Sequence, residues 1–193
     1  ISIKDNTLIS GENGSGKSTL LDALQYLLVG AKSGAKFNIA ATDEAKRTLE
    51  GYVRGRIGAE NKEYLRPGDV ISHVALEFYD EQNDQFGVIG VILELPKGGT
   101  LKERFYLLDN LNIHDGIFLD KNKPRDYRSM KAYLKSIQID LDIFNTQKDY
   151  RDALAKYFGI DAKKYSKILP KALAFRPIDL QSFVFEFLLD DDP

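Results

Sequence analysis

The sequence of 193 residues contains no cysteine, and this absence excludes disulfide bonds and thiolate metal sites. It also lacks a long apolar run. The longest stretch of apolar residues and glycine, residues 86–93, is far shorter than the about 20 residues of a membrane-spanning helix. Neither sign of charge is in large excess, because 27 lysines and arginines face 29 aspartates and glutamates. The charge of the whole chain therefore does not indicate a nucleic-acid partner, and any contact with DNA must depend on local basic patches.

Histidine is scarce as well. The two histidines, His73 and His114, have no second candidate ligand at metal-binding spacing, so both are expected to be structural or on the surface. No signal peptide is visible. With 43% hydrophobic and 29% charged residues, the composition is that of a globular protein. We expect a cytoplasmic protein with no membrane partner.

Residues 11–18, GENGSGKS, match the spacing G-x-x-x-x-G-K-[ST] of a phosphate-binding loop. Glycines let such a loop curl with its N–H groups inward, and the following helix directs its free N–H groups and its dipole at the anion. In this pattern Lys17 reaches the β- and γ-phosphates as a catalytic residue, and the Ser18 hydroxyl binds Mg²⁺. We therefore predict ATP and Mg²⁺ as cofactors. The predicted binding segment comprises Gly11, Glu12, Asn13, Gly14, Ser15, Gly16, Lys17, Ser18 and Thr19.

The flanks of the loop fit the same interpretation. Residues 7–10 are predicted to end a strand, and a helix is predicted to begin at the end of the loop. Five leucines recur with the period of one apolar helix face: Leu20, Leu21, Leu24, Leu27 and Leu28. A phosphate loop between a strand and a helix is the context that the motif requires.

Two glycine-containing loops are predicted after this helix, over residues 30–41 and 51–70. Between them a short helix is predicted over residues 43–49, with Thr42 as its cap. The last third is expected to be mainly helical. Its predicted helices cover 126–136, 147–158 with a Thr146 cap, 162–174 and 178–190.

Three strand-like runs precede these helices, at 71–79, 86–95 and 101–108. The links between them have the length of hairpin turns, whereas parallel strands need crossovers of about a dozen residues or more. The sequence therefore predicts an antiparallel meander. A small P-loop kinase would instead alternate strands with helices and build a parallel sheet. An antiparallel sheet directly behind the first helix is typical of ATP-binding cassette ATPases.

Three stretches, LISGENGSGKSTLLDALQYLL, FNIAATDEAKRTLEGYVRG and SHVALEFYD, resemble the N-terminal half of an SMC-like ATPase head. The similarity is to the MukB/MksB/JetC branch, the motor subunits of bacterial condensin-like and Wadjet plasmid-defence complexes. The final stretch, KALAFRPIDLQSFVFEFLLDDDP, is similar to the same branch where a long coiled coil would begin. The resemblance implies an α/β fold: the N-terminal lobe of an ABC-type P-loop NTPase, with an antiparallel β meander and a helical C-terminal part.

Heads of this family are split, so residues 1–193 would form the Walker A lobe. Its own C-terminal half would follow a coiled coil and carry the signature motif and the Walker B acids. The resemblance further implies that ATP joins the heads of a homodimer, bridged by kleisin-type and winged-helix-type subunits. Hydrolysis would drive DNA loop extrusion and chromosome organisation at the bacterial nucleoid, or plasmid defence.

The motifs that the chain lacks agree with this split. No LSGG-like signature is present, and Gly98 and Gly99 are better interpreted as a hairpin turn. The only Walker-B-like string, VALEFYDE at 74–81, alternates like a half-exposed strand that leads into a polar turn. We therefore expect ATP hydrolysis only when the C-terminal half of the head complements this chain.

Two further site residues are implied by the resemblance. Arg54 lies where such heads have an arginine near the nucleotide, at the surface where heads engage, although a solvated loop arginine is the alternative. Gln181 is a candidate for the glutamine that senses Mg²⁺ and the attacking water, and thus a candidate catalytic residue and metal ligand.

Two groups of basic residues are candidates for contact with DNA phosphates, with a solvated lysine face as the alternative for each. The first has the i, i+4, i+8 spacing of one helix face, which Pro170 would kink: Lys163, Lys167 and Lys171. The second comprises Lys121, Lys123, Arg125, Arg128 and Lys131.

Two other functions stay open. The chain could be a self-contained small P-loop kinase or NTPase, which would need its own acidic magnesium partner and substrate lid. It could also be a non-enzymatic interaction module that a bound nucleotide orders. Turnover by the chain alone would favour the first, and tight binding without turnover beside the C-terminal half would favour the second.

Overall fold

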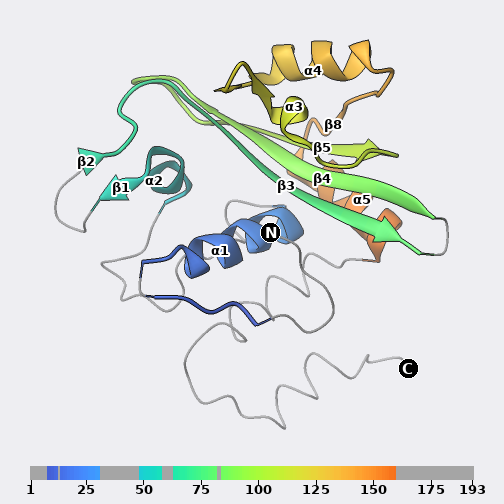
Figure 1. The fold of residues 1–193 in the computed structure, drawn as a ribbon, viewed down its shortest axis with the longest axis horizontal. Helices are drawn as coiled ribbons and strands as arrows, with labels where there is room; N and C mark the ends of the chain where they lie inside the picture. The colour runs from blue at the N-terminus through green and yellow to red at the C-terminus, as the bar shows by residue number, and fades with distance from the viewer. Residues whose placement is uncertain (1–7, 13, 31–47, 58–62, 82–83, 160–193) are drawn as a thin grey trace, which may run out of the picture.

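The computed structural model describes residues 8–12, 14–30, 48–57, 63–81 and 84–159 (Figure 1). Several predictions fall outside these ranges. They concern Asn13, the loop over 30–41 beyond Gly30, the Thr42 cap with residues 43–47 of its helix, the helices over 162–174 and 178–190, Gln181, and the basic residues Lys163, Lys167 and Lys171.

A four-stranded antiparallel sheet with the strand order β3-β4-β5-β8 forms the centre of the described fold. Its strands are β3 (Val70–Asp80), β4 (Gln85–Leu95), β5 (Lys102–Asp109) and β8 (Asp142–Ile143). In the turn between β4 and β5, the Gly99 N–H donates to the Pro96 carbonyl at 3.1 Å, as a hairpin turn requires. The predicted antiparallel meander is therefore confirmed, with each strand boundary within one residue of the prediction.

Helices cover both faces of this sheet, so the described fold is a mixed α/β structure (Figure 1). One face carries α1 (Lys17–Val29), α2 (Leu49–Arg54) and α5 (Gln147–Phe158). The other carries α3 (Asp115–Phe118) and α4 (Tyr127–Ser136). Because side chains alternate along a strand, β4 sends Ile89 and Val91 into the first core and Val88 and Ile92 into the second. The central strand is thus buried on both faces.

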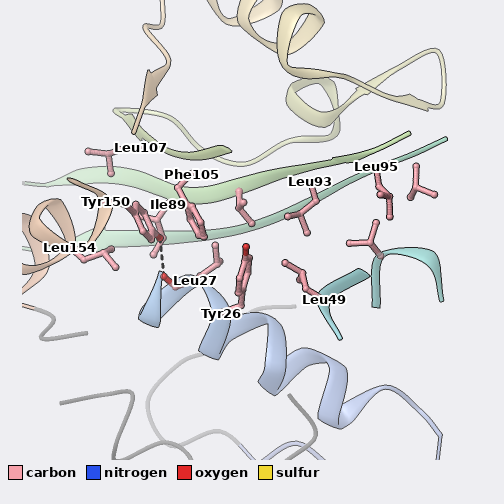
Figure 2. Close-up of a cluster of buried hydrophobic side chains, with 13 residues drawn as sticks. Tyr26, Leu27, Leu49, Ile89, Leu93, Leu95, Phe105, Leu107, Tyr150 and Leu154 are labelled. Carbon is pink, nitrogen blue, oxygen red and sulfur yellow. Dashed lines mark hydrogen bonds between the residues drawn. The ribbon is translucent and has the colours of Figure 1, made fainter. Parts of the chain in front are cut away.

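The first core holds the helix of the phosphate loop against the sheet (Figure 2). Tyr26 and Leu27 of α1 lie below the sheet, and Tyr150 and Leu154 of α5 lie beside them. The Phe105 ring of β5 stacks on Tyr150 with centroids 4.5 Å apart. Aromatic rings bury large areas, so this cluster fixes the C-terminal part of α1.

The buried face of α1 differs from the predicted leucine face. Of the five leucines only Leu27 is buried, and the helix also turns Asp22, Gln25 and Tyr26 inward. The strand expected before the loop is not observed over the described residues 8–10, which have no regular secondary structure. The helix itself is confirmed.

The loop predicted over residues 51–70 is wrong for most of its described length. Those residues include the end of α2, the short strands β1 (Arg56–Ile57) and β2 (Glu63–Tyr64), and the start of β3. The α2 helix begins after Thr48, whose side chain accepts from the Gly51 N–H at 3.0 Å. Glycine is common in loops, but Gly51 lies inside α2 and Gly55 ends it.

The predicted helices at 126–136 and 147–158 are observed as α4 and α5. The Asp126 side chain caps α4 by accepting from the Ser129 N–H at 2.7 Å. The predicted Thr146 cap of α5 is part of a capping box with Asp149. Between α3 and α4, β6 (Leu119–Asp120) and β7 (Lys123–Pro124) pair in a short antiparallel hairpin.

Candidate nucleotide site

The phosphate-loop motif leads directly into the first turn of α1. Gly14 and Gly16 have φ values of 85° and 91°, a region that favours glycine because it lacks a Cβ atom. Gly16 is the N-cap of α1, so no side chain caps this helix, and its first turn contains no acidic residue. The N–H groups of that turn have no acceptor within the helix. No capping side chain and no acidic residue of the first turn therefore competes with an anion for these N–H groups.

Lys17 lies across the loop that precedes it. Its Nζ donates to the carbonyl oxygens of Gly11 and Glu12, both at 2.7 Å, and to the Ser15 hydroxyl at 3.4 Å. The loop itself is closed by the Ser15 N–H, which donates to the Glu12 carbonyl at 3.2 Å. The ammonium group thus stays at the mouth of the loop, on exposed acceptors that a phosphate oxygen can replace.

The donor set of this loop fits a nucleotide phosphate chain. Backbone N–H groups at a helix N-terminus and one ammonium group are donors that match phosphate oxygens. Ser18 and Thr19 are exposed on the first turn of α1, where the Ser18 hydroxyl can serve as an oxygen ligand for Mg²⁺. The roles of the individual residues in nucleotide binding stay predictions.

Three tyrosine hydroxyls hold α1 in place. Tyr150 Oη donates to the Leu27 carbonyl at 3.0 Å, as Figure 2 shows, and Tyr26 Oη donates to Glu103 on β5. The third contact joins α1 to α2, where Tyr52 Oη donates to the Asp22 carboxylate. Burial raises the pKa of Tyr26, with a further contribution from Glu103, and burial also raises the pKa of Tyr150. Both hydroxyls therefore remain protonated donors.

Asp22 and Tyr52 were not among the predicted site residues. Asp22 is a carboxylate with only 5% of its surface exposed, one helical turn after Ser18. A signal was present in the sequence, because an aspartate inside an apolar helix must find a partner when it is buried. The identity of that partner was not readable, since Tyr52 is 30 residues away.

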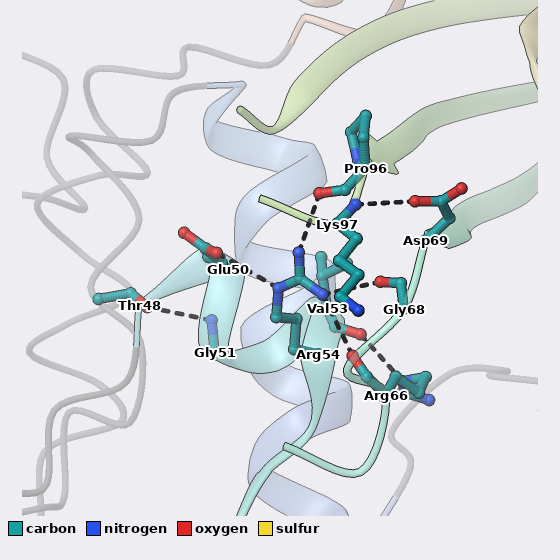
Figure 3. Close-up of polar contacts among 10 residues, drawn as sticks. All are labelled: Thr48, Glu50, Gly51, Val53, Arg54, Arg66, Gly68, Asp69, Pro96 and Lys97. Atoms are coloured by element: carbon teal, nitrogen blue, oxygen red, sulfur yellow. Dashed lines mark hydrogen bonds and ion pairs between the residues drawn. The ribbon is translucent and has the colours of Figure 1, made fainter. Parts of the chain in front are cut away.

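Arg54 is a buried residue of α2, with 5% of its surface exposed (Figure 3). Its guanidinium donates to three carbonyl oxygens, those of Gly68 at 2.8 Å, Pro96 at 3.0 Å and Arg66 at 3.2 Å. Its Nε also pairs with Glu50 at 3.4 Å. Arg54 therefore ties α2 to the ends of β3 and β4 and is not a solvated loop arginine. A role at the nucleotide stays a prediction.

The Walker-B-like string at 74–81 lies on β3, the edge strand of the antiparallel sheet. Residues 74–78 are half-buried, and Glu81 is exposed in the turn that follows. Glu77 accepts a hydrogen bond from the backbone N–H of Ile113. The interpretation as a half-exposed strand that leads into a polar turn is therefore confirmed. This strand is not the buried parallel strand of a Walker B motif.

The two histidines take no part in a metal cluster among the residues that the structure describes. His114 is exposed, and His73 is half-buried with its Nε2 2.8 Å from the Arg125 carbonyl. Because a carbonyl only accepts, Nε2 carries the proton. Burial lowers the pKa of His73, against smaller raising effects of that carbonyl and of Glu94. The prediction that both histidines are structural or on the surface is confirmed.

The second basic group contains four exposed residues and one that is bound within the protein. Lys121, Lys123, Arg128 and Lys131 are exposed on the β6–β7 hairpin and α4. Arg125 is instead engaged within the protein. Its guanidinium donates to the Gly116 carbonyl at 3.1 Å and lies 4.6 Å from the centroid of the Tyr133 ring.

The comparison with protein families agrees with this geometry. A family model described as the P-loop containing region of AAA domain matches residues 1–44, a segment that includes the phosphate loop and α1. No curated protein matches the chain. Among the described residues, no helix is both long and apolar enough to cross a membrane. The chain thus contains a P-loop region of the NTPase type, which indicates nucleotide binding.

Proposed function

We propose that this chain is the ATP-binding, N-terminal half of an SMC-like ATPase head of the ABC type. The observation that carries the proposal is the phosphate loop, with Lys17 on its exposed carbonyls, at the start of a helix that packs directly on an antiparallel sheet. A compact P-loop kinase would place a parallel sheet at this point. The resemblance of three sequence stretches to such heads supports the choice of this family.

In this function the chain binds and orients the phosphates. The N–H groups of the loop and of the first turn of α1 donate to the phosphate oxygens, and Lys17 exchanges its carbonyl acceptors for them. Ser18 would hold Mg²⁺, which supplies neutralisation of charge on the β- and γ-phosphates. These contacts stabilise developing charge, which is one of the two requirements of phosphoryl transfer.

The other requirement is a group that orients the attacking water. Asp22 is buried and accepts from Tyr52, and Glu81 lies beyond the end of β3 that is farther from α2 (Figure 1). Neither carboxylate is placed for this role in the described part of the chain. We infer that the C-terminal half of the head supplies the Walker B acids and the signature motif, while Gln181 and Arg54 remain the candidate contributions of this chain.

The proposed assembly is a homodimer with ATP between engaged heads, bridged by kleisin-type and winged-helix-type subunits. Slow hydrolysis would drive the movement of DNA in chromosome organisation or plasmid defence at the nucleoid. Contact with DNA by Lys163, Lys167 and Lys171 belongs to this proposal. Exposure of Lys121, Lys123, Arg128 and Lys131 supports a second basic surface on the same lobe.

A steady-state ATPase assay tests this function. We expect the 193-residue chain to bind ATP with negligible turnover, and addition of the C-terminal half of the head to raise turnover by several orders of magnitude, on the order of 1,000-fold or more. Lys17→Ala should remove the restored activity. Hydrolysis by the isolated chain as fast as by the reconstituted head, abolished by Glu81→Gln, would establish the compact enzyme instead. ATP binding without turnover beside the C-terminal half would establish the interaction module.

A further inference from the structure

The three tyrosine contacts of α1 lie at different distances from the phosphate loop. Tyr150 and Tyr26 both hold the C-terminal part of the helix, whereas Tyr52 binds Asp22, one turn after Ser18. Because residues i and i+4 are neighbours on a helix surface, Ser18 and Asp22 share one side of α1. We propose that Tyr52 is a positioning residue of the nucleotide site, whose hydroxyl fixes Asp22 and with it the helix turn that presents Ser18. This inference rests on the proposed binding of ATP.

The burial of Asp22 makes its contact with Tyr52 consequential. A carboxylate with 5% of its surface exposed has little access to water, so its charge depends on hydrogen-bond donors from the protein. A hydrogen bond to a charged acceptor is stronger than one between neutral groups. Removal of the hydroxyl takes away a donor that fixes Asp22 to α2, so the turn of α1 that carries Ser18 is held less tightly.

The α2 helix is able to hold Tyr52 in a defined place. Two residues after Tyr52, Arg54 is bound by the carbonyl oxygens of Gly68 and Pro96, at the ends of β3 and β4 (Figure 3). Val53 between them is buried in the first core. The short helix is therefore anchored to the sheet by packing and by a buried guanidinium. The sheet determines the position of α2, and the Tyr52 hydroxyl transmits it to α1.

A binding experiment on the full chain separates positioning from general stability. Affinity for labelled ATP is measured with Mg²⁺ and with EDTA in the parent, Tyr52→Phe and Tyr150→Phe, together with thermal unfolding of each nucleotide-free protein. Tyr150→Phe is the matched control, since it removes a hydroxyl that binds α1 at the Leu27 carbonyl. We expect Tyr52→Phe to weaken binding of Mg-ATP about tenfold, whereas Tyr150→Phe stays within about twofold of the parent.

The Mg²⁺ dependence is the readout that a purely structural role would not change. If Tyr52 positions the turn of Ser18, Tyr52→Phe reduces the factor by which Mg²⁺ tightens ATP binding. Asp22→Asn should keep much of the affinity for Mg-ATP that Asp22→Leu loses, because the asparagine amide oxygen still accepts from Tyr52. If Asp22→Leu does not fold, Tyr52→Phe and Asp22→Asn still decide the question.

Two results overturn the inference while the proposed function stands. One is an affinity for Mg-ATP that is equal in Tyr52→Phe and Tyr150→Phe, while Lys17→Ala abolishes ATP binding. The other is an equal weakening by Tyr52→Phe with and without Mg²⁺. If the parent chain itself does not bind ATP, the proposed function and the inference fail together.

Discussion

The helices α1 and α5 have nearly the same length, 13 and 12 residues, but they begin in opposite ways. At α5, the Thr146 side chain accepts from the Asp149 N–H at 3.1 Å, and the Asp149 side chain accepts from the Thr146 N–H at 3.2 Å. At α1, the N-cap is Gly16 and the first residue is a lysine. A helix N-terminus prefers a capping side chain and negative charge. The α5 helix satisfies both preferences with its own side chains. The α1 helix satisfies neither, and a bound phosphate would supply both the acceptors and the negative charge.

The comparison shows that the absence of a capping side chain and of a first-turn acid at α1 agrees with a binding site at that helix end. The cap of α5 contributes to folding and closes that end to anions. The uncapped end of α1 gives up this stabilisation, about 1 kcal/mol for a typical cap, and retains donors for phosphate. Lys17 adds a positive charge at the positive end of the helix dipole, which is unfavourable until an anion binds. Each of the following changes acts on one side of this contrast.

The largest effect is expected from Lys17→Ala. The substitution removes the ammonium group that donates to the Gly11 and Glu12 carbonyls and that would bind the phosphates. We expect ATP affinity to fall on the order of 100-fold, as the loss of more than one charge-assisted hydrogen bond implies. A thermal shift assay measures this change, because Mg-ATP should raise the unfolding temperature of the parent and not that of the variant. An equal shift in both proteins would contradict the assignment of the loop.

A smaller effect, opposite in sign for binding and stability, is expected from Thr19→Glu. An acidic residue in the first turn of α1 stabilises the nucleotide-free helix by about 0.3–1 kcal/mol. The same charge repels phosphate, so ATP affinity should fall about tenfold. Gln147→Glu is the matched control in the first turn of α5, where stability should rise similarly without any change in ATP binding. Urea unfolding and ATP titration of both variants measure the contrast, and parallel behaviour of the two variants would remove it.

The smallest effect concerns α5 alone. Thr146→Ala removes the side chain that accepts from the Asp149 N–H, and it should lower the free energy of unfolding by about 1 kcal/mol. ATP affinity should not change, because this end of α5 is not part of the nucleotide site. Denaturant unfolding with a parallel ATP titration checks both expectations. A loss of ATP affinity in this variant would show that the two helix ends are coupled.

The loop and the helix of the candidate site were predictable because their signals are local. The spacing of Gly11, Gly16, Lys17 and Ser18 specifies a loop that leads into a helix, and the loop and helix depend on residues adjacent in the chain. The strands of the meander were predictable for the same reason, since short links permit only antiparallel neighbours. Thr146 three residues before Asp149 is a local cap signal, and it is confirmed.

The parts that could not be predicted depend on partners far apart in the chain. The alternative of a solvated Arg54 is wrong, because its guanidinium binds carbonyls 12, 14 and 42 residues away. The α2 helix was missed because glycine lowers helix propensity, while packing of Leu49 and Val53 in the first core outweighs that cost. The leucine pattern of α1 was correct as a sign of a helix but did not identify the face that the sheet buries.

By itself, then, the sequence determined the phosphate loop, the helix that follows it, the antiparallel meander and the cap of α5. These features arise from backbone preferences and from hydrogen bonds between near neighbours. Only the tertiary structure decided that Tyr52 meets Asp22, that Arg54 anchors α2, and that Tyr26 and Leu27 form the face of α1 against the sheet. Such contacts form when the sheet brings distant segments together, and burial then requires each charge and hydroxyl to find a partner across that distance.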